Sequence, residues 1–333
     1  MKHDVTDVDS PFVFIVGCGR SGTTMLRSMF DSHPDIAIPG ESGFIWQRRN
    51  RYEGSDGFDA QRFVDYLLGH RRFRRWGLDR SVVASTLLDP APSEYADALR
   101  RLYRLYADSR GVERYGDKTP GHVLRIPLLA DLFDEARVIH LIRDGRNVAL
   151  SYMDIKEWGP SRAAEAALHW RRRVHQGRKD GEALGPDRYQ EVTYEALVDD
   201  PETELRRLAS FADLAFNDSM LRYFERAPEV LTTELHPHRH QGLFKPPTKG
   251  LRDWRSTMDM NDIACFEAVA GETLTDFGYE RRFERVPSTT RVKARMGVGA
   301  SQLRRTGKLA RGAGRKVQRQ LRSAGKSAQG GPR

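Results

Sequence analysis

Cysteine and long apolar runs are nearly absent from this chain of 333 residues. Its two cysteines, Cys18 and Cys265, have no CxxC spacing and are too few for a disulfide framework or a structural zinc site. No apolar run approaches the roughly 20 residues of a membrane-crossing helix, and residues 1–10 lack the basic, apolar character of a signal peptide. We therefore expect a cytoplasmic globular protein with residues 1–10 as a flexible arm.

Acidic residues are missing from the C-terminal end. Residues 286–333 contain 13 Lys or Arg and no Asp or Glu, so the rest of the chain carries a net charge of −4 although the whole carries +9. This composition predicts a basic disordered tail, because it cannot form a packed core. The tail could contact anionic lipid at the inner face of a membrane or act as a solubilising extension. Nucleic-acid binding as the main role is disfavoured, because the rest of the chain is acidic.

The third absence is that of a lysine in a glycine-rich turn. The apolar run 12–16 leads into Gly17-Cys18-Gly19-Arg20-Ser21-Gly22-Thr23-Thr24, and helical spacing follows, which predicts strand, turn and helix. Such a turn binds phosphate through backbone N–H groups and the helix N-terminus. Thr23, however, replaces the Walker A lysine that reaches the β and γ phosphates of a triphosphate. The turn therefore suits a shorter 5′ group, with Arg20 as its cation.

Strand and helix patterns alternate along the chain, which predicts an α/β fold with a parallel central sheet and helices on both faces. Further strands are expected at residues 35–39, 137–142 and 189–192. Residues 43–112 have helical periodicity and indicate a helical insertion, whereas the polar stretch 115–122 is expected to be a loop. Residues 11–285 are thus expected to form the folded domain.

A second anion site is predicted after the strand at 137–142. Arg143 ends this strand and Ser151 lies two helical turns later, so the two side chains can converge on one phosphate. A rival interpretation makes Asp144 the magnesium ligand of a P-loop kinase or NTPase that uses Mg-ATP. The missing Walker A lysine and the position of Arg143 directly before Asp144 count against it.

These motifs carry a family resemblance. Arg20-Ser21-Gly22-Thr23-Thr24 with the preceding strand resembles the 5′-phosphosulfate loop of sulfotransferases that use 3′-phosphoadenosine 5′-phosphosulfate (PAPS), especially the bacterial carbohydrate-type and tyrosylprotein branch. Residues 142–151 resemble the loop that holds the 3′-phosphate of PAPS, and the resemblance runs from about residue 11 to 283. It implies a P-loop-containing fold that moves a sulfuryl group to a hydroxyl or amine of a carbohydrate, a small metabolite or a tyrosine-like phenol, without a metal.

The resemblance also implies roles for single residues. Arg20 and Lys118, the latter within Gly116–Pro120, would neutralise the leaving group. Glu41, 21 residues past Arg20, would be the base, with His122 as the alternative. Contacts to PAPS are implied for these residues: Arg20, Ser21, Gly22, Thr23, Thr24, Arg143, Ser151, Tyr194, Lys249 and Gly250.

Some questions stay open at this stage. Tyr194 could lie near the adenine or serve as a core tyrosine, and Thr248 replaces an arginine that many cytosolic members have before Lys249. The basic and aromatic segment 71–76 could be a solvated face or a lid over the acceptor. The residues His236, His238 and His240 are a weak metal candidate. Neither the acceptor nor the oligomeric state follows from the sequence.

Overall fold

The computed structural model describes residues 10–46, 49–55, 57–155, 158–234, 242–248 and 253–299. The chain divides into two compact units. The first contains Met1–Val148 and Arg172–Asp253, and the second contains Ala149–Arg171 and Trp254–Arg333. The chain enters the second unit within α7 (Gly145–Met153) and leaves it within α8 (Ala163–Glu182).

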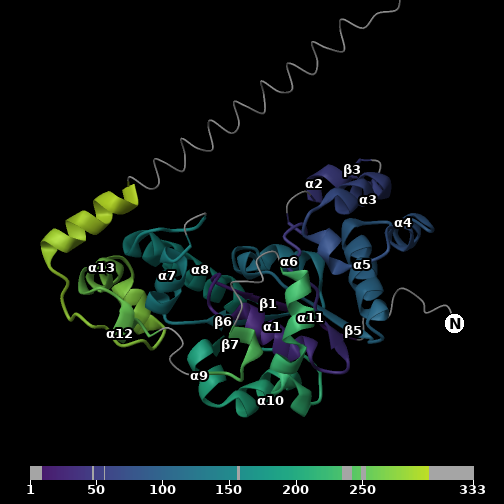
Figure 1. Cartoon of the computed structure of the whole chain (residues 1–333). Coiled ribbons are helices and arrows are strands. Elements are labelled where there is room, and N and C mark those ends of the chain that lie inside the picture. Colours follow the sequence, from purple (N-terminus) through teal and green to yellow (C-terminus); the bar gives the residue numbers. More distant parts are fainter. Residues whose placement is uncertain are drawn as a thin grey trace, which may run out of the picture. The chain divides into compact units, whose positions relative to one another are not determined.

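A five-stranded sheet lies at the centre of the first unit (Figure 1). Its strands stand in the order β2 (Ile36–Ala37), β5 (Arg114–Lys118), β1 (Phe12–Gly17), β6 (Ala136–Ile142) and β7 (Tyr189–Thr193). Every neighbouring pair is parallel. In register, Ile15 of β1 pairs with Lys118 on one side and Ile139 on the other. The loops that follow β1, β5 and β6 therefore meet at one edge, where open α/β sheets bind ligands.

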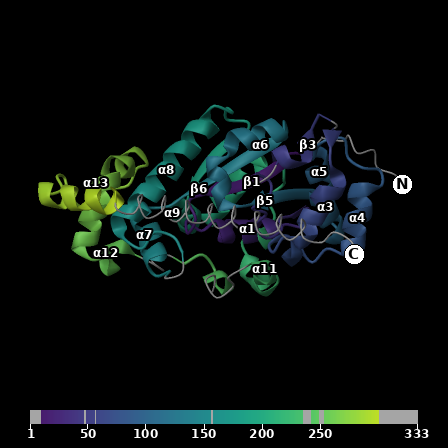
Figure 2. The ribbon, with the colours of Figure 1, turned by 90° about the horizontal axis from the view of Figure 1, so that it is seen from above.

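Helices cover both faces of this sheet, which confirms the expected fold class (Figure 2). Alternate residues of β1 belong to two different hydrophobic cores, with Phe12 and Phe14 in one and Val13 and Ile15 in the other. The first core also takes side chains from α3 (Ala60–Gly69), α4 (Arg80–Leu88), α5 (Tyr95–Ser109) and α6 (Ile126–Leu132). The second takes them from α1 (Thr23–Asp31), α9 (Tyr194–Asp199), α10 (Pro201–Phe211) and α11 (Ala227–Thr233).

The expected insertion at 43–112 is helical. Between β2 and β5 it holds α3, α4 and α5 together with α2 (Arg49–Tyr52), the antiparallel pair β3 (Glu53–Gly54) and β4 (Gly57–Phe58), and the 3₁₀ turn η1 (Phe73–Trp76). Further 3₁₀ turns of the first unit are η2 (Pro120–Leu124), η3 (Asp218–Met220) and η4 (Tyr223–Arg226). The aromatic residues of the insertion pack together, as Trp76 does against Tyr103 and Tyr106.

The sequence interpretation of residues 115–122 as a loop is wrong for the first part of that stretch. Residues Arg114–Lys118 form strand β5, which lies between β1 and β2. The strand carries no alternating apolar pattern, because its buried side chains at 117 and 118 are charged. Partners from other elements compensate these charges, and such partners cannot be recognised from local sequence.

The second unit is built around Trp170 of α8. Its ring lies 5.9 Å from that of Phe266 and 6.2 Å from that of Phe277, measured between centroids. Phe266 belongs to α13 (Met260–Asp276), which follows the short α12 (Trp254–Thr257). Residues 288–299 are helical as well, so this part of the expected disordered tail 286–333 is a helix, and residues 300–333 lie outside the described residues.

Candidate functional site

The turn between β1 and α1 requires glycine at two positions. Gly22 has a φ of +102°, and a Cβ there would lie 2.6 Å from the ring of Tyr194. A Cβ on Gly17 would lie 2.5 Å from the carbonyl oxygen of Leu141. Gly22 is also the N-cap of α1, so no side chain caps this helix, and its first turn has no acidic residue. The first N–H groups of α1 are therefore oriented to bind an anion.

The hydroxyl residues of this turn fit the same kind of ligand. Ser21 is fully buried, and its Oγ has no hydrogen-bond partner among the described residues. Thr24 directs its Oγ1 toward Lys118, whose Nζ donates to it at 3.2 Å. Arg20 has a φ of +73°, a conformation that only a few per cent of non-glycine residues adopt. An unpartnered buried hydroxyl beside an uncapped helix start suits the phosphosulfate end of PAPS.

Lys118 occupies the end of β5 and is fully buried. Its Nζ donates to Oε1 of Glu41 at 3.3 Å and to Oε1 of Glu234 at 3.0 Å, in addition to its contact with Thr24. The structure thus brings together three residues from the turn, the loop after β2 and the end of β5 that the sequence had assigned to one site. It adds Glu234, at the C-terminal end of α11, which sequence reasoning missed.

Glu41 is held from the other side by the insertion. Arg72, the residue before η1, donates through its Nη1 to Oε2 of Glu41. Trp76 of the same segment donates its indole N–H to the carbonyl oxygen of Gly40 at 2.9 Å. The side chain of Glu41 remains 23% exposed, whereas Lys118 is completely covered. The segment 71–76 therefore contacts the loop of the expected base directly.

His122 lies in a different, fully buried cluster. Its Nδ1 is 3.0 Å from Oδ1 of Asp117, and Tyr103 donates its hydroxyl to Oδ2 of Asp117 at 2.6 Å. Burial alone would raise the pKa of Asp117, but the neighbouring His122 and the hydrogen bonds from Tyr103 and Ser42 hold this pKa below its usual value. Since His122 has no exposed surface, it is less accessible to an acceptor than Glu41.

The second predicted anion loop lies against the first. The guanidinium carbon of Arg143 lies 4.0 Å from the ring centroid of Tyr194, and the same ring packs on Gly22. Asp144 accepts hydrogen bonds from Arg146 through the backbone N–H, Nε and Nη2, at 2.8–3.0 Å. A carboxylate held in this way is not oriented as a magnesium ligand. Ser151 is buried on the part of α7 that belongs to the second unit.

Arg27 is a second contributor that sequence reasoning missed. It lies on α1 and is fully buried, with its Nε donating to the carbonyl oxygen of Ile38 at 2.8 Å and its Nη1 to Oε1 of Glu234 at 2.9 Å. The sequence itself sets Arg27 apart, because it is the only charged residue in the mainly apolar segment 25–30. A buried charge needs a partner, although nothing local identifies Glu234.

Several predicted positions fall outside the described residues: Lys249, Gly250 and the histidines at 236, 238 and 240. The part of the chain with described positions contains no group of three or more His, Cys, Asp or Glu that could hold a metal ion. It also contains no helix long and apolar enough to cross a membrane.

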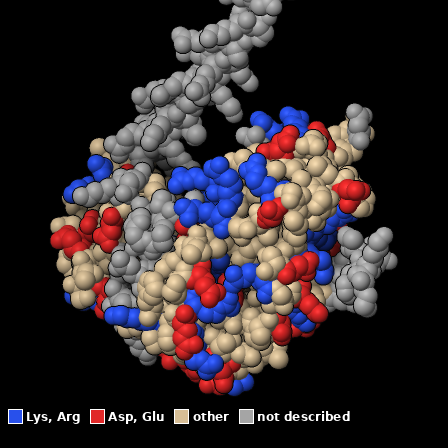
Figure 3. Space-filling model, turned by 45° about the vertical axis from the view of Figure 1, so that its right-hand side comes forward, with Lys and Arg blue, Asp and Glu red and all other residues tan. Residues whose placement is uncertain are grey.

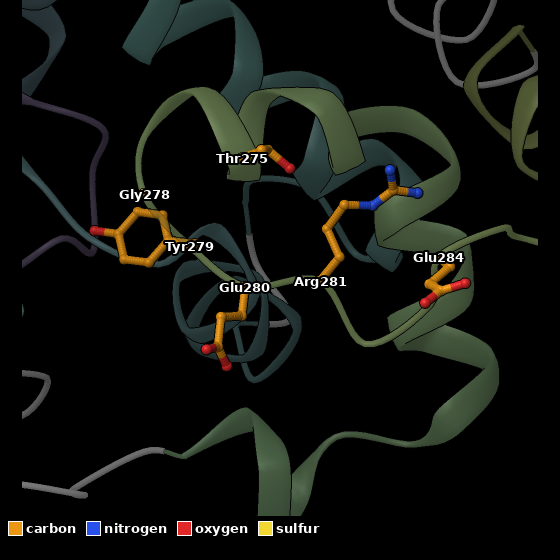
Figure 4. Close-up of a pocket in the computed structure, with 6 residues that line it drawn as sticks. All are labelled: Thr275, Gly278, Tyr279, Glu280, Arg281 and Glu284. Carbon is orange, nitrogen blue, oxygen red and sulfur yellow. The ribbon is translucent and has the colours of Figure 1, made fainter.

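A hollow of about 570 Å³ lies in the second unit (Figure 4). Its lining consists of Thr275, Gly278, Tyr279, Glu280, Arg281 and Glu284. In the close-up, these side chains come from the end of α13 and the chain that follows it. No residue assigned to PAPS or to catalysis lines this hollow.

Comparison with known proteins finds one matching family model and several similar chains. A model described as the sulfotransferase family matches residues 11–218. Protein-tyrosine sulfotransferase A of Caenorhabditis elegans is 23% identical over 285 residues, which cover 81% of this chain and 68% of the relative. Protein-tyrosine sulfotransferase 1 of Danio rerio is 25% identical over 280 residues, which cover 82% of this chain and 73% of the relative.

Two solved structures share the fold. The sulfotransferase domain from the Synechococcus PCC 7002 olefin synthase has a TM-score of 0.60 and 24% identity, covering 84% of this chain and 99% of that chain. The sulfotransferase domain from the curacin biosynthetic pathway has a TM-score of 0.57 and 18% identity, covering 82% of this chain and 99% of that chain.

Proposed function

Because the chain belongs to the sulfotransferase family, and is thus a sulfotransferase, we propose that it moves the sulfuryl group of PAPS to a hydroxyl group of its acceptor. One observation carries this proposal. Thr24 of the glycine-rich turn, Lys118 of β5 and Glu41 after β2 meet at the carboxyl edge of the sheet, although 94 and 77 positions separate Lys118 from the other two. A cation and an acidic group are thereby joined to an anion-binding turn.

The binding of PAPS would involve both loops. The N–H groups at the start of α1, with Arg20, would hold its 5′ end, and Arg143 would hold its 3′-phosphate while Tyr194 flanks the nucleotide. When bound, PAPS supplies an electron-poor sulfur and a phosphate leaving group. Lys118 and Arg20 would then stabilise the negative charge that grows on the leaving phosphate, as cations do in phosphoryl transfer.

Glu41 would accept the proton of the acceptor hydroxyl. Its side chain is partly exposed, with Arg72 contacting one of its oxygens and Lys118 the other. A base must lie within hydrogen-bond reach of the proton that it removes, and this exposed position favours Glu41. His122 stays the alternative base, which would require the buried cluster around Asp117 to open.

The acceptor that we propose first is a phenol, as in a tyrosine side chain. The named relatives in the worm and the fish are protein-tyrosine sulfotransferases, and the sequence resemblance includes that branch. Carbohydrates and small metabolites with hydroxyl or amine groups remain the competing acceptors. Transfer of labelled sulfate from PAPS to tyrosine-containing peptides, oligosaccharides and simple phenols would rank them.

Calorimetric binding of adenosine 3′,5′-bisphosphate, the desulfated form of PAPS, tests the donor. We expect micromolar affinity without magnesium, at least a tenfold loss in Arg143→Ala, and no change in the control Arg206→Ala, whose charge pairs with Glu202 on the surface. Tighter, magnesium-dependent binding of ATP would overturn the proposal in favour of a P-loop kinase.

A further inference from the structure

The ammonium group of Lys118 has no donor left for a ligand. A lysine has three N–H donors, and here they are directed to Thr24 at 3.2 Å, Glu41 at 3.3 Å and Glu234 at 3.0 Å. Lys118 can therefore stabilise a leaving group only if one of these three contacts is released. The structure indicates which one that is.

The two carboxylates around Lys118 differ in how firmly they are held. Oε1 of Glu234 accepts from both Lys118 and Arg27, and all three side chains are buried, with Glu234 only 6% exposed. Arg27 is itself fixed by its hydrogen bond to the carbonyl oxygen of Ile38. Glu41 makes the longest of the three contacts, and its other oxygen faces the partly exposed Arg72. Glu41 can turn toward an acceptor, whereas Glu234 cannot leave without stranding buried charges.

We propose that Glu234 is a positioning residue for sulfuryl transfer. It holds the charge of Lys118 at the end of β5 and keeps that charge compensated while Glu41 releases Lys118 and turns to the acceptor. This inference rests on the proposed function, in which Lys118 and Glu41 act on the donor and acceptor.

A purely structural role of Glu234 would give a different experimental result. If Glu234 served only to neutralise Arg27, its removal would lower stability but leave the chemistry per folded molecule unchanged. The sharing of one oxygen between Arg27 and Lys118 predicts that both properties change. The experiment must therefore measure stability and chemistry separately.

The test compares wild type, Glu234→Gln and the matched control Glu229→Gln. Glu229 lies on the same helix α11 and is 57% exposed, where it pairs with Arg226. For each protein we would measure kcat and KM for PAPS, calorimetric binding of adenosine 3′,5′-bisphosphate and the melting temperature. Hydrogen exchange of the Lys118 ammonium group, followed by ¹⁵N NMR without any ligand and assigned with Lys118→Arg, adds a readout that does not depend on activity.

For Glu234→Gln we expect kcat to fall about tenfold or more, with the affinity for the bisphosphate within about threefold of wild type. Exchange of the Lys118 ammonium protons should accelerate about tenfold as one strong acceptor is weakened. Glu229→Gln should match wild type in every measurement.

An unchanged kcat and unchanged ammonium exchange in folded Glu234→Gln would overturn the inference and leave a structural role. If Glu234→Gln does not fold, Glu234→Asp replaces it, because aspartate keeps the charge but has a side chain shorter by one methylene. This variant should show the same fall in kcat and the same faster ammonium exchange, both smaller in magnitude. A wild-type protein that neither binds the bisphosphate nor transfers sulfate would instead refute the proposed function, and the two failures are thereby distinguished.

Discussion

At the scale of single residues, the candidate site is a set of charges that neutralise one another. Lys118 and Arg27 share Glu234, and Lys118 and Arg72 share Glu41. Such a set is costly to bury unless every charge has a partner, and here the three cations come from α1, from β5 and from the residue before η1. The same pairing leaves Glu41 as the acidic group of the set with appreciable solvent contact.

Replacing Glu41 by glutamine should lower turnover by about 10² or more, because the amide cannot accept the acceptor proton. Binding of adenosine 3′,5′-bisphosphate should persist, since Glu41 is not among the groups expected to hold the nucleotide. Steady-state kinetics and calorimetry measure the two effects, with the exposed Glu202→Gln as the control. A turnover near that of wild type would remove Glu41 as the base and make His122 the residue to test.

How far residues could be predicted from sequence depends on the range of their contacts. Thr24, Glu41 and Lys118 were assigned to one site by the resemblance to sulfotransferase loops, although Lys118 was expected in a loop and not at the end of strand β5. Arg27 and Glu234 are 207 positions apart, and only the folded chain, in which α1 and α11 contribute to the same hydrophobic core, brings them together. No local pattern encodes such a contact.

At the scale of elements, β5 shows the limit of hydrophobic patterning. The strands β1 and β6 are almost entirely buried and apolar, and their positions were predicted well. Strand β5 reads Arg-Tyr-Gly-Asp-Lys, because its end supplies Asp117 to one face and Lys118 to the site. A strand that carries functional charges loses the alternation by which strands are recognised.

Helix α8 shows a second element-scale feature, a close approach through small residues. A Cβ on Gly177 would lie 2.7 Å from the ring of His140, and one on Gly181 would overlap the ring of Tyr189. Glycine thus lets the helix approach β6 and β7 more closely than any other residue would. The same glycines weaken the helical pattern in the sequence of this segment, because glycine has a low helix propensity.

We predict that Gly181→Ala destabilises the protein, by about 1–3 kcal/mol, since overpacking against Tyr189 outweighs the gain in helix propensity. The matched control is Gly69→Ala in α3, where nothing lies within 4 Å of the added Cβ. That control should be neutral or slightly stabilising. Urea unfolding of both variants measures the difference, and equal stability of the two would show that Tyr189 can move aside without cost.

At the scale of the whole molecule, stability should depend on pH through a buried network on β6, β7 and α8. Burial alone would raise the pKa of Glu191, but hydrogen bonds with His140, Arg178 and Tyr189 lower it to about 2. A carboxyl with a lowered pKa contributes stability above its unfolded pKa of 4.5 and loses it as pH falls toward 2. The contribution at neutral pH is about 2 kcal/mol after allowance for solvent screening.

Glu191→Gln should therefore be about 2 kcal/mol less stable than wild type at pH 7, and the difference should shrink as the pH falls below about 4.5. Urea unfolding at a series of pH values down to about pH 3 measures it. The exposed Glu202→Gln serves as the control and should show a small difference at every pH. If the difference in free energy of unfolding between wild type and Glu191→Gln does not change with pH, the carboxylate charge is not what stabilises the network.

Charge is also distributed unevenly over the molecule. On the face in Figure 3, Lys and Arg gather in one broad patch while Asp and Glu lie in smaller groups around it. Residues 300–333 add ten Lys or Arg without any acidic residue. Since Ala294 is buried and residues 288–299 are helical, the basic segment is best removed after residue 299 rather than at 285.

We predict that the full chain associates with vesicles containing phosphatidylserine at low salt, and that a chain of residues 1–299 does not. Each well-placed cation contributes about 1 kcal/mol at such a surface, and salt screens this attraction, so binding should weaken at physiological ionic strength. Co-sedimentation measures the effect, with vesicles of phosphatidylcholine alone as the control. Because the truncation leaves the glycine-rich turn and Lys118 in place, sulfate transfer to a soluble acceptor should be unchanged. Equal sedimentation of the two chains would identify the basic segment as a solubilising extension.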